Sequence, residues 1–207
     1  MSDGTNIEWT DATWNPLRGC SRVSEGCRNC YAETVAGRFA GHGQPYEGLA
    51  KLDAGGNRRW TGEVRLIESA LLQSLRWTKP RRIFVNSMSD LFHEKVPDEW
   101  IDRIFAAMAL APQHTFQILT KRPQRMQEYI ISRTKSLEVF TFKSSLADAA
   151  RKISFAAGHF FPGNAPLMFF SNRDEDGNVP QGCVATPGWP LSHVWLGVSV
   201  EDQKTAD

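Results

Sequence analysis

Short apolar runs alternate with amphipathic segments along most of the chain. Each apolar run is short enough to be a strand buried in a parallel sheet. Strands are expected at residues 7–14, 83–86, 116–119 and 194–200, and helices at 31–39, 69–77 and 97–108 and from Pro123 onward. Alternation of this kind indicates right-handed βαβ units, so we expect an α/β fold with at least four such units.

Two stretches interrupt this pattern. Residues 41–62 are rich in Gly, Pro, Asn and charge and predict an irregular connection, followed by a short β-like run at 64–66. Residues 133–192 stand where two to six residues would suffice to connect a helix to a strand. We therefore expect one α/β domain, 1–207, with an irregular insertion at 133–192. A lid over the site and a plain surface excursion are both open readings of that insertion.

Composition and charge bound the class of protein. A chain of 207 residues with 41% hydrophobic content can form one domain with a core. The net charge of +1 gives no long-range attraction to nucleic acid or membrane, although a local basic groove stays open. The start of the chain lacks a signal-peptide pattern, and no run approaches the apolar length of a membrane span. We expect a cytoplasmic protein with no membrane partner.

Three of the four cysteines fall close together: Cys20, Cys27 and Cys30. Cys27 and Cys30 form a C-x2-C pair, a spacing that turns both sulfurs toward one metal centre. In a reducing cytosol such clustered thiols are expected to be ligands rather than disulfides. The loop therefore predicts a metal or an iron–sulfur site, with packed reduced thiols as the alternative.

The number of cysteines favours one kind of centre. A [4Fe–4S] cluster held by three thiolates leaves one iron open for a small molecule, whereas structural zinc closes with four protein ligands. Cys183, inside the expected insertion, or His93 could supply a fourth ligand. We favour the iron–sulfur cluster, and zinc stays open.

Polar residues follow each later strand. They occupy 86–94, 120–122 and 199–203. Because carboxyl ends of parallel strands meet at one edge of a sheet, we expect these groups to lie near the cysteine loop.

Several blocks of the sequence resemble a known family. They are residues 10–16, 19–20, 23–24, 26–27, 29–33, 83–93, 118–123 and 194–203. Together they resemble the phage- and prophage-borne three-cysteine-motif family of uncharacterised proteins, and the resemblance covers 7–131 and 193–207. That family is more distantly similar to radical S-adenosylmethionine enzymes of the spore photoproduct lyase kind. The resemblance implies a partial (incomplete) parallel (β/α) barrel of radical-SAM type.

The resemblance also implies a cofactor set. A [4Fe–4S] cluster on the three cysteines would bind S-adenosylmethionine at its open iron, and a radical would abstract hydrogen from the substrate. The residues implied to contact cofactor or substrate are Asn86, Ser87, Lys121, Arg122 and Ser199, with Asp90 and Glu201 as the catalytic candidates. Asn86, Ser87 and Asp90 are expected at the ribose or amino group, Lys121 or Arg122 at the carboxylate, and Ser199 and Glu201 near cofactor or substrate.

Each of these polar residues also has a structural reading. Asp90 can cap the turn that follows it, Lys121 and Arg122 can be a solvated pair before a helix, and His93 can be a satisfied surface imidazole. Both readings stay open at this point.

Two departures from the resembled enzymes matter. Six residues separate Cys20 from Cys27, where radical enzymes have three, and the chain stops at Asp207, where the family continues with further strands. We therefore expect a truncated barrel that a partner protein could complete.

The expected function is modification or repair of nucleic acid in a phage or mobile element. A zinc-bearing nucleic-acid or protein-binding module and an inactive fragment are the alternatives.

Overall fold

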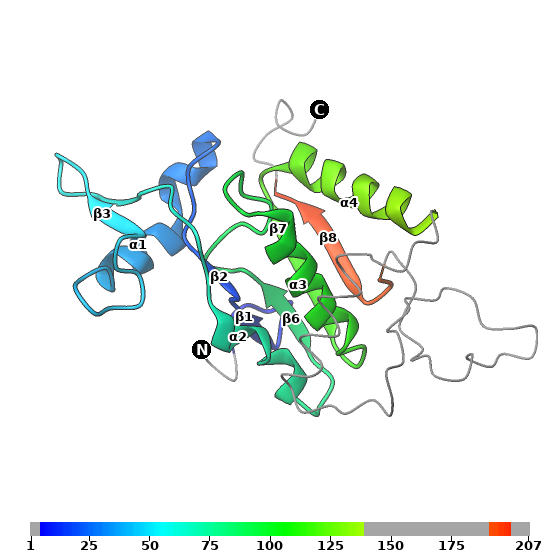
Figure 1. The fold of residues 1–207 in the computed structure, drawn as a ribbon. Helices are drawn as coiled ribbons and strands as arrows, with labels where there is room; N and C mark the ends of the chain where they lie inside the picture. Colours follow the sequence, from blue (N-terminus) through cyan, green and yellow to red (C-terminus); the bar gives the residue numbers. More distant parts are fainter. Residues whose placement is uncertain (1–4, 139–190, 200–207) are drawn as a thin grey trace, which may run out of the picture.

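A four-stranded parallel sheet forms the centre of the molecule (Figure 1). The computed structural model describes residues 5–138 and 191–199. The strands are β1 (Ala12–Trp14), β6 (Arg82–Val85), β7 (Thr115–Thr120) and β8 (Val194–Val198), hydrogen-bonded in the order β1-β6-β7-β8. One row of the register crosses the whole sheet through Trp14, Val85, Ile118 and Leu196. These are the four strands that the apolar runs predict.

The helices follow the predicted order, with one exception. They are α1 (Tyr31–Arg38), α2 (Glu68–Leu71), α3 (Asp98–Ala109) and α4 (Pro123–Glu138), with two 3-10 helices, η1 (Glu25–Asn29) and η2 (Ser74–Arg76). The single helix predicted at 69–77 is wrong, because it divides into α2 and η2. The amide of Trp77 donates to the carbonyl of Ser74 at 3.4 Å and closes the 3-10 turn, and Nε2 of His114 lies 3.1 Å from the same carbonyl.

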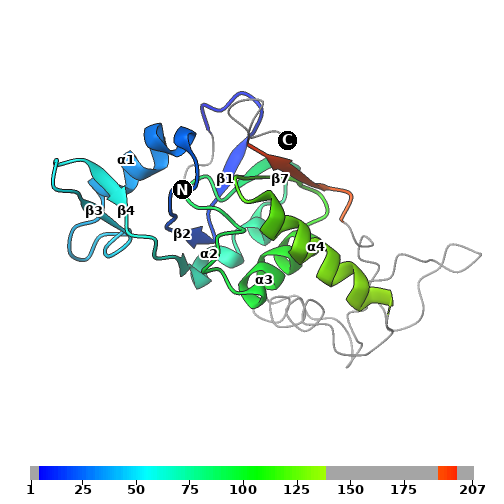
Figure 2. The ribbon, with the colours of Figure 1, turned by 90° about the horizontal axis from the view of Figure 1, so that it is seen from above.

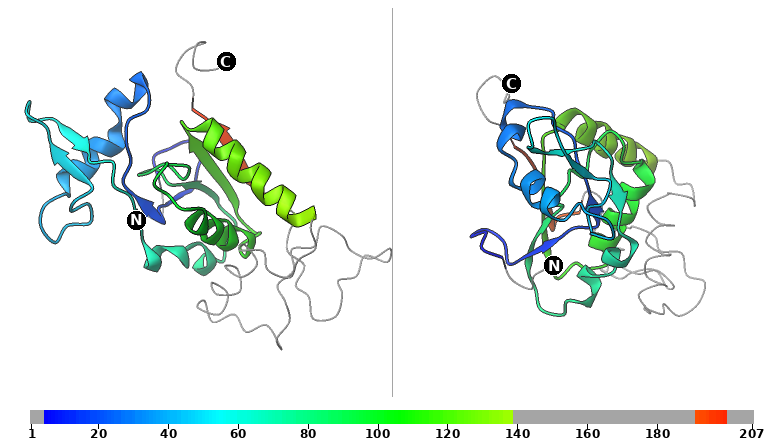
Figure 3. Two further views of the ribbon diagram at one scale, coloured as in Figure 1. Left: turned by 45° about the horizontal axis from the view of Figure 1, so that its top comes forward. Right: turned by 90° about the vertical axis from the view of Figure 1, so that its left-hand side faces the viewer.

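The helices that connect the strands lie on one face of the sheet. Strand order follows chain order without reversal, and right-handed crossovers then place α3 and α4, which follow β6 and β7, on the same side. Figure 2 and Figure 3 show α3 and α4 together on that side. Along β7, Phe116 and Ile118 are buried beneath the helices, whereas Leu119 points the other way and is 40% exposed. The described strands form an open sheet.

A large apolar core fills the space between the sheet and its helices. Its largest fully buried side chains include Trp14, Phe92, Phe105, Phe116 and Tyr129. The rings of Trp14 and Phe116 lie 5.7 Å apart, and the indole of Trp14 donates a 2.7 Å hydrogen bond to the carbonyl of Ala70 in α2. Burial of these aromatic rings is the main force that holds the sheet to its helices.

A smaller unit projects from the sheet beside α1 (Figure 1). It contains the antiparallel hairpin of β3 (Ala50–Leu52) and β4 (Arg58–Trp60). A second antiparallel pair, β2 (Leu17–Arg18) and β5 (Arg65–Leu66), joins this unit to the sheet. The prediction of an irregular connection at 41–62 is therefore wrong for the two strands of this hairpin, whereas residues 41–49 are irregular and residues 55–57 lie in its turn, as predicted. The turn of the hairpin is held by Asp53, whose Oδ1 accepts hydrogen bonds from the amides of Gly55 and Asn57.

Some predicted features lie outside the described residues. Among them are Cys183, Glu201 and most of the insertion expected at 133–192, although α4 continues to Glu138. Within the described ranges, no helix has the length and apolar character that crossing a membrane requires.

Candidate site at the three-cysteine loop

The cysteine loop runs from β2 to α1 and begins at the carboxyl edge of the sheet. Gly19 forms a parallel bridge with Ser89, in the turn after β6. The φ angle of Gly19 is 94°, and a Cβ atom there would lie 2.1 Å from the carbonyl oxygen of Glu63. Only glycine fits this approach, so the residue before Cys20 fixes where the loop enters the edge.

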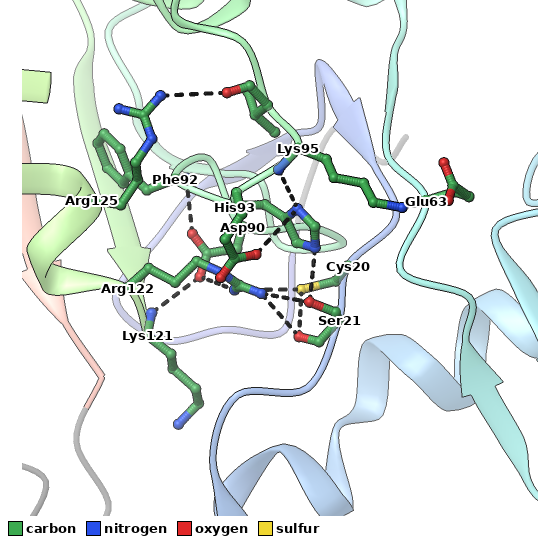
Figure 4. Close-up of polar contacts among 12 residues, drawn as sticks. Cys20, Ser21, Glu63, Asp90, Phe92, His93, Lys95, Lys121, Arg122 and Arg125 are labelled. Atoms are coloured by element: carbon green, nitrogen blue, oxygen red, sulfur yellow. Dashed lines mark hydrogen bonds and ion pairs between the residues drawn. The ribbon is translucent and has the colours of Figure 1, made fainter.

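Arg122, at the end of β7, holds the start of this loop (Figure 4). Its guanidinium donates to Oγ of Ser21 at 2.9 Å and to the carbonyl of Ser21 at 3.2 Å. Two carboxylates form ion pairs with the same guanidinium, Asp90 at 3.0 Å and Glu94 at 2.8 Å, and fix its position. The same group reaches Sγ of Cys20 at 4.0 Å. Arg122 is buried, so the predicted solvated pair with Lys121 before a helix is wrong for this residue.

Asp90 accepts four hydrogen bonds within this cluster. Oδ1 receives the amide of Phe92 at 3.0 Å and the hydroxyl of Thr120 at 2.7 Å, and Oδ2 receives the amide of Lys121 at 3.1 Å besides Arg122. A carboxylate has about four acceptor positions, so all of them are filled. The bond to Phe92 confirms that Asp90 caps its own turn. This geometry favours a positioning role, and the catalytic role stays a prediction.

His93 contacts the same loop from the other side. Its Nδ1 accepts the amide of Lys95 at 3.1 Å, so Nε2 carries the proton and donates to Oγ of Ser21 at 2.9 Å. Burial lowers the pKa of the imidazole and keeps it neutral. The ring is satisfied, as expected, but it is buried, so the expected surface position is wrong.

The three cysteines are free, half-buried thiols. Burial raises the pKa of Cys20 to about 12. Burial acts in the same direction on Cys27, but hydrogen bonds at Val23 and Ser24, with the charge of Lys121, hold the pKa of that thiol below its ordinary value. Cys27 is therefore the better thiolate of the two before any metal binds.

Two further observations relate the cysteines to one another. Cys20 and Cys30 both pack against the small apolar cluster of the α1 unit. The guanidinium of Arg22 lies within electrostatic reach of both Cys27 and Cys30. Within the described part of the chain, no three side chains of His, Cys, Asp or Glu are grouped tightly enough to hold a metal ion.

Asn86 and Ser87 hold the turn after β6. Asn86 has a φ of 60°, a left-handed conformation that asparagine tolerates, and its Oδ1 accepts the amide of Leu17 at 3.3 Å. The hydroxyl of Ser87 donates to Oδ1 of Asn15 at 3.2 Å. Both residues lie at the predicted edge, where these bonds connect the turn to the segment after β1.

Ser199 directly follows β8, beside the site. Its amide donates to the carbonyl of Thr120 at 2.9 Å, and the residue is exposed. The structure thus brings Asp90, Lys121 and Arg122 to the cysteine loop, while Ser199 lies at the neighbouring strand end. Sequence reasoning gave no role to Ser21, Glu94 or Thr120. Glu94 and Thr120 lie within the polar runs expected at this edge, and Ser21 directly follows a candidate ligand.

Fold and site together define an α/β protein with a parallel sheet. At the carboxyl edge of that sheet lie a three-cysteine loop and the buried Arg122 with its carboxylate partners Asp90 and Glu94. The sequence matches the family described as "Protein of unknown function (DUF5131)" over residues 4–207, and the chain belongs to that family. No curated protein and no solved structure gave a match.

Proposed function

We propose that Cys20, Cys27 and Cys30 hold a [4Fe–4S] cluster and that the protein is a radical S-adenosylmethionine-type enzyme of a phage or mobile element, acting on nucleic acid. The observation that carries this proposal is the contact of the cysteine loop with the carboxyl edge of a parallel sheet. Arg122 makes that contact through Ser21 and reaches the sulfur of Cys20 at 4.0 Å. Ligand sites of parallel α/β folds lie at this edge.

The chemistry of the donor set supports a cluster, and binding would draw together three thiols that the described structure does not group tightly enough to hold a metal ion. Three free thiols lie on one short loop, and hydrogen bonds or positive charge act on two of them, through Arg122 at Cys20 and Lys121 at Cys27. Charge of this sign favours bound thiolates, and hydrogen bonds to cluster sulfurs adjust the reduction potential. When bound, the cluster and S-adenosylmethionine would supply a carbon radical that removes a hydrogen atom from the substrate.

The residues around the loop would position this chemistry. Asp90 and Glu94 fix Arg122, which in turn fixes the backbone at Ser21 and so places Cys20. Lys121 follows the same strand and lies within electrostatic reach of Cys27, which suits it to the carboxylate of the nucleoside ligand. Arg122 is less suited to that carboxylate, because Asp90 and Glu94 already pair with it.

The sheet supports the partial-barrel part of the proposal. Its strand order runs without reversal, and its connecting helices lie on one face, as in the wall of a (β/α) barrel. The other face carries the exposed side chains of Leu119 and Trp195, at 40% and 59% exposure. In a barrel these side chains would face the interior, with the remaining wall supplied by residues outside the described ones or by a partner chain.

Formation of 5′-deoxyadenosine tests the reaction. The protein is reconstituted with iron and sulfide under argon, mixed with S-adenosylmethionine and dithionite, and the product is measured by mass spectrometry. We expect 5′-deoxyadenosine from the unaltered chain and from the matched control Cys183→Ala, and none from Cys27→Ala. A chain that retains its cluster but forms no 5′-deoxyadenosine contradicts the enzyme proposal.

A further inference from the structure

A polar cavity of about 210 Å³ lies between the β3–β4 hairpin, α1 and the cysteine loop. Three arginines line it, Arg28 from η1 and Arg58 and Arg59 from β4, and Glu33 is the one carboxylate among the lining residues. A small cavity with several guanidinium groups is suited to an anion with several oxygen acceptors.

The positive charge of the hairpin lowers the stability of its β-ladder. Residues 50–60 contain Lys51, Arg58 and Arg59 but only one acidic residue, Asp53. Lys51 lies directly opposite Arg59 in the register of the two strands. Like charges at directly opposed positions destabilise a β-ladder, and Arg59 is held there by its ion pairs with Asp53 and Glu33.

Arg58 is placed for a ligand rather than for an internal partner. Its methylene stem lies over Gly37 of α1, where a Cβ atom would come within 2.3 Å of Cδ of Arg58. Gly37 therefore allows this arginine to cross the helix. Among the described residues Arg58 forms no salt bridge, although it borders the cavity.

The other two arginines already have carboxylate partners. Arg28 pairs with Glu25 at 2.6 Å, and the two side chains are 68% and 78% exposed. Such an exposed pair contributes little to stability, so exchanging it for a bidentate anion costs little. Arg59 pairs with Asp53 at 3.0 Å and with the buried carboxylate of Glu33 at 3.6 Å, so it lines the cavity from a fixed position.

We propose that this cavity binds a phosphodiester group of a single-stranded nucleic acid. Arg28 stands between Cys27 and Cys30, so a strand held here by its backbone runs beside the cysteine loop. Glu33 links the two parts, because its Oε1 accepts the amide of Trp60 in β4 at 2.9 Å and its Oε2 pairs with Arg22 of the loop. The choice of nucleic acid over other phosphate compounds rests on the proposed function.

Binding of a short fluorescein-labelled single-stranded oligodeoxynucleotide, followed by anisotropy, tests this site on the full reconstituted chain. The variant Arg28→Gln/Arg58→Gln removes two charges but keeps two of the three methylene groups of each stem. The matched control Arg76→Gln/Lys79→Gln removes two exposed charges next to η2, away from the hairpin. Circular dichroism and the visible spectrum are recorded for every variant, so that loss of fold or of cluster is seen separately from loss of binding.

We expect the Arg28→Gln/Arg58→Gln variant to raise the dissociation constant at least about tenfold and to lower the slope of log affinity against log salt by about 0.7, since one single-strand phosphate contact is lost. The control should bind as the unaltered chain does. Equal weakening in both variants would overturn the site. If inorganic phosphate binds with the same dependence on Arg28 and Arg58 while the oligonucleotide does not bind, the cavity is a free-phosphate site and the nucleic-acid assignment is wrong. Either result leaves the test of 5′-deoxyadenosine formation unaffected.

Discussion

The body of the protein and the α1–hairpin unit are stabilised in different ways. The body contains a continuous cluster of twenty buried hydrophobic residues, whereas the described α1–hairpin unit is built on six. No residue of η1, which contains Cys27, is buried. Instead, the buried carboxylate of Glu33 connects the loop, helix and hairpin. The body therefore folds by apolar burial, and the cysteine region has the most to gain from a bound metal centre.

Removing a core ring should give the largest effect. Phe116→Ala deletes a fully buried ring that contacts Trp14, and we expect the free energy of unfolding to fall by about 3–5 kcal/mol. Urea unfolding followed by tryptophan fluorescence measures this change. Trp60→Ala in the small cluster should leave the unfolding of the body almost unchanged. An equal loss from both substitutions would mean that the two regions form one cooperative unit.

The second largest effect should come from breaking the buried ion pair between Asp90 and Arg122. Asp90→Asn removes the buried carboxylate that pairs with Arg122 and leaves the more exposed Glu94 to pair with it, and we expect a loss of about 3 kcal/mol in the same unfolding experiment. Asp11→Asn serves as control, because Asp11 and Arg82 form an ion pair whose side chains are 46% and 51% exposed. The control should change little. Similar behaviour of both variants would contradict the role of Asp90 as a clamp.

Glu33→Gln should loosen the α1–hairpin unit alone. The amide keeps an acceptor for Trp60 but loses the charge that pairs with Arg22 and Arg59. We expect hydrogen exchange at the amide of Trp60 to accelerate about tenfold, corresponding to about 1.4 kcal/mol of local opening. The amide of Ile118 in the body should exchange as before. Faster exchange in both places would show that Glu33 supports the whole fold.

The smallest expected effect is the pH dependence of the free energy of unfolding that the buried His114 causes. Burial holds the pKa of His114 below its ordinary value of 6.5, so the unfolded chain binds the proton more tightly. Stability should therefore be constant above that value and decline as pH falls through it. His114→Gln should reduce this decline without abolishing it, because the pKa of His93 is lowered as well. Urea unfolding at a series of pH values measures the difference, and an unchanged pH profile would exclude His114 as a source of it.

The fold of the body could be predicted from sequence because its signals are local. Periodic apolar positions identified α1 and α3, and short apolar runs identified β6 and β7. The hairpin was missed because Lys51, Arg58 and Arg59 give its strands no apolar alternation. Those strands depend on distant contacts, above all the bond from the amide of Trp60 to Glu33.

The site was predictable to a similar extent. The convergence of parallel strand ends was enough to place Asp90, Lys121 and Arg122 near the cysteines. The partners of Arg122 could not be predicted, because Ser21 lies about one hundred residues away along the chain and contacts it only in the folded protein. For the same reason, the saturation of Asp90 by four donors could not be read from its neighbours in sequence.

Iron content and visible spectrum after anaerobic reconstitution test the central claim most directly. If the three cysteines share one cluster, the unaltered chain and Cys183→Ala will hold roughly four irons and show broad visible absorption. Cys27→Ala will be colourless. A colourless unaltered chain with one tightly bound zinc, or loss of metal from Cys183→Ala as complete as from Cys27→Ala, would contradict the account.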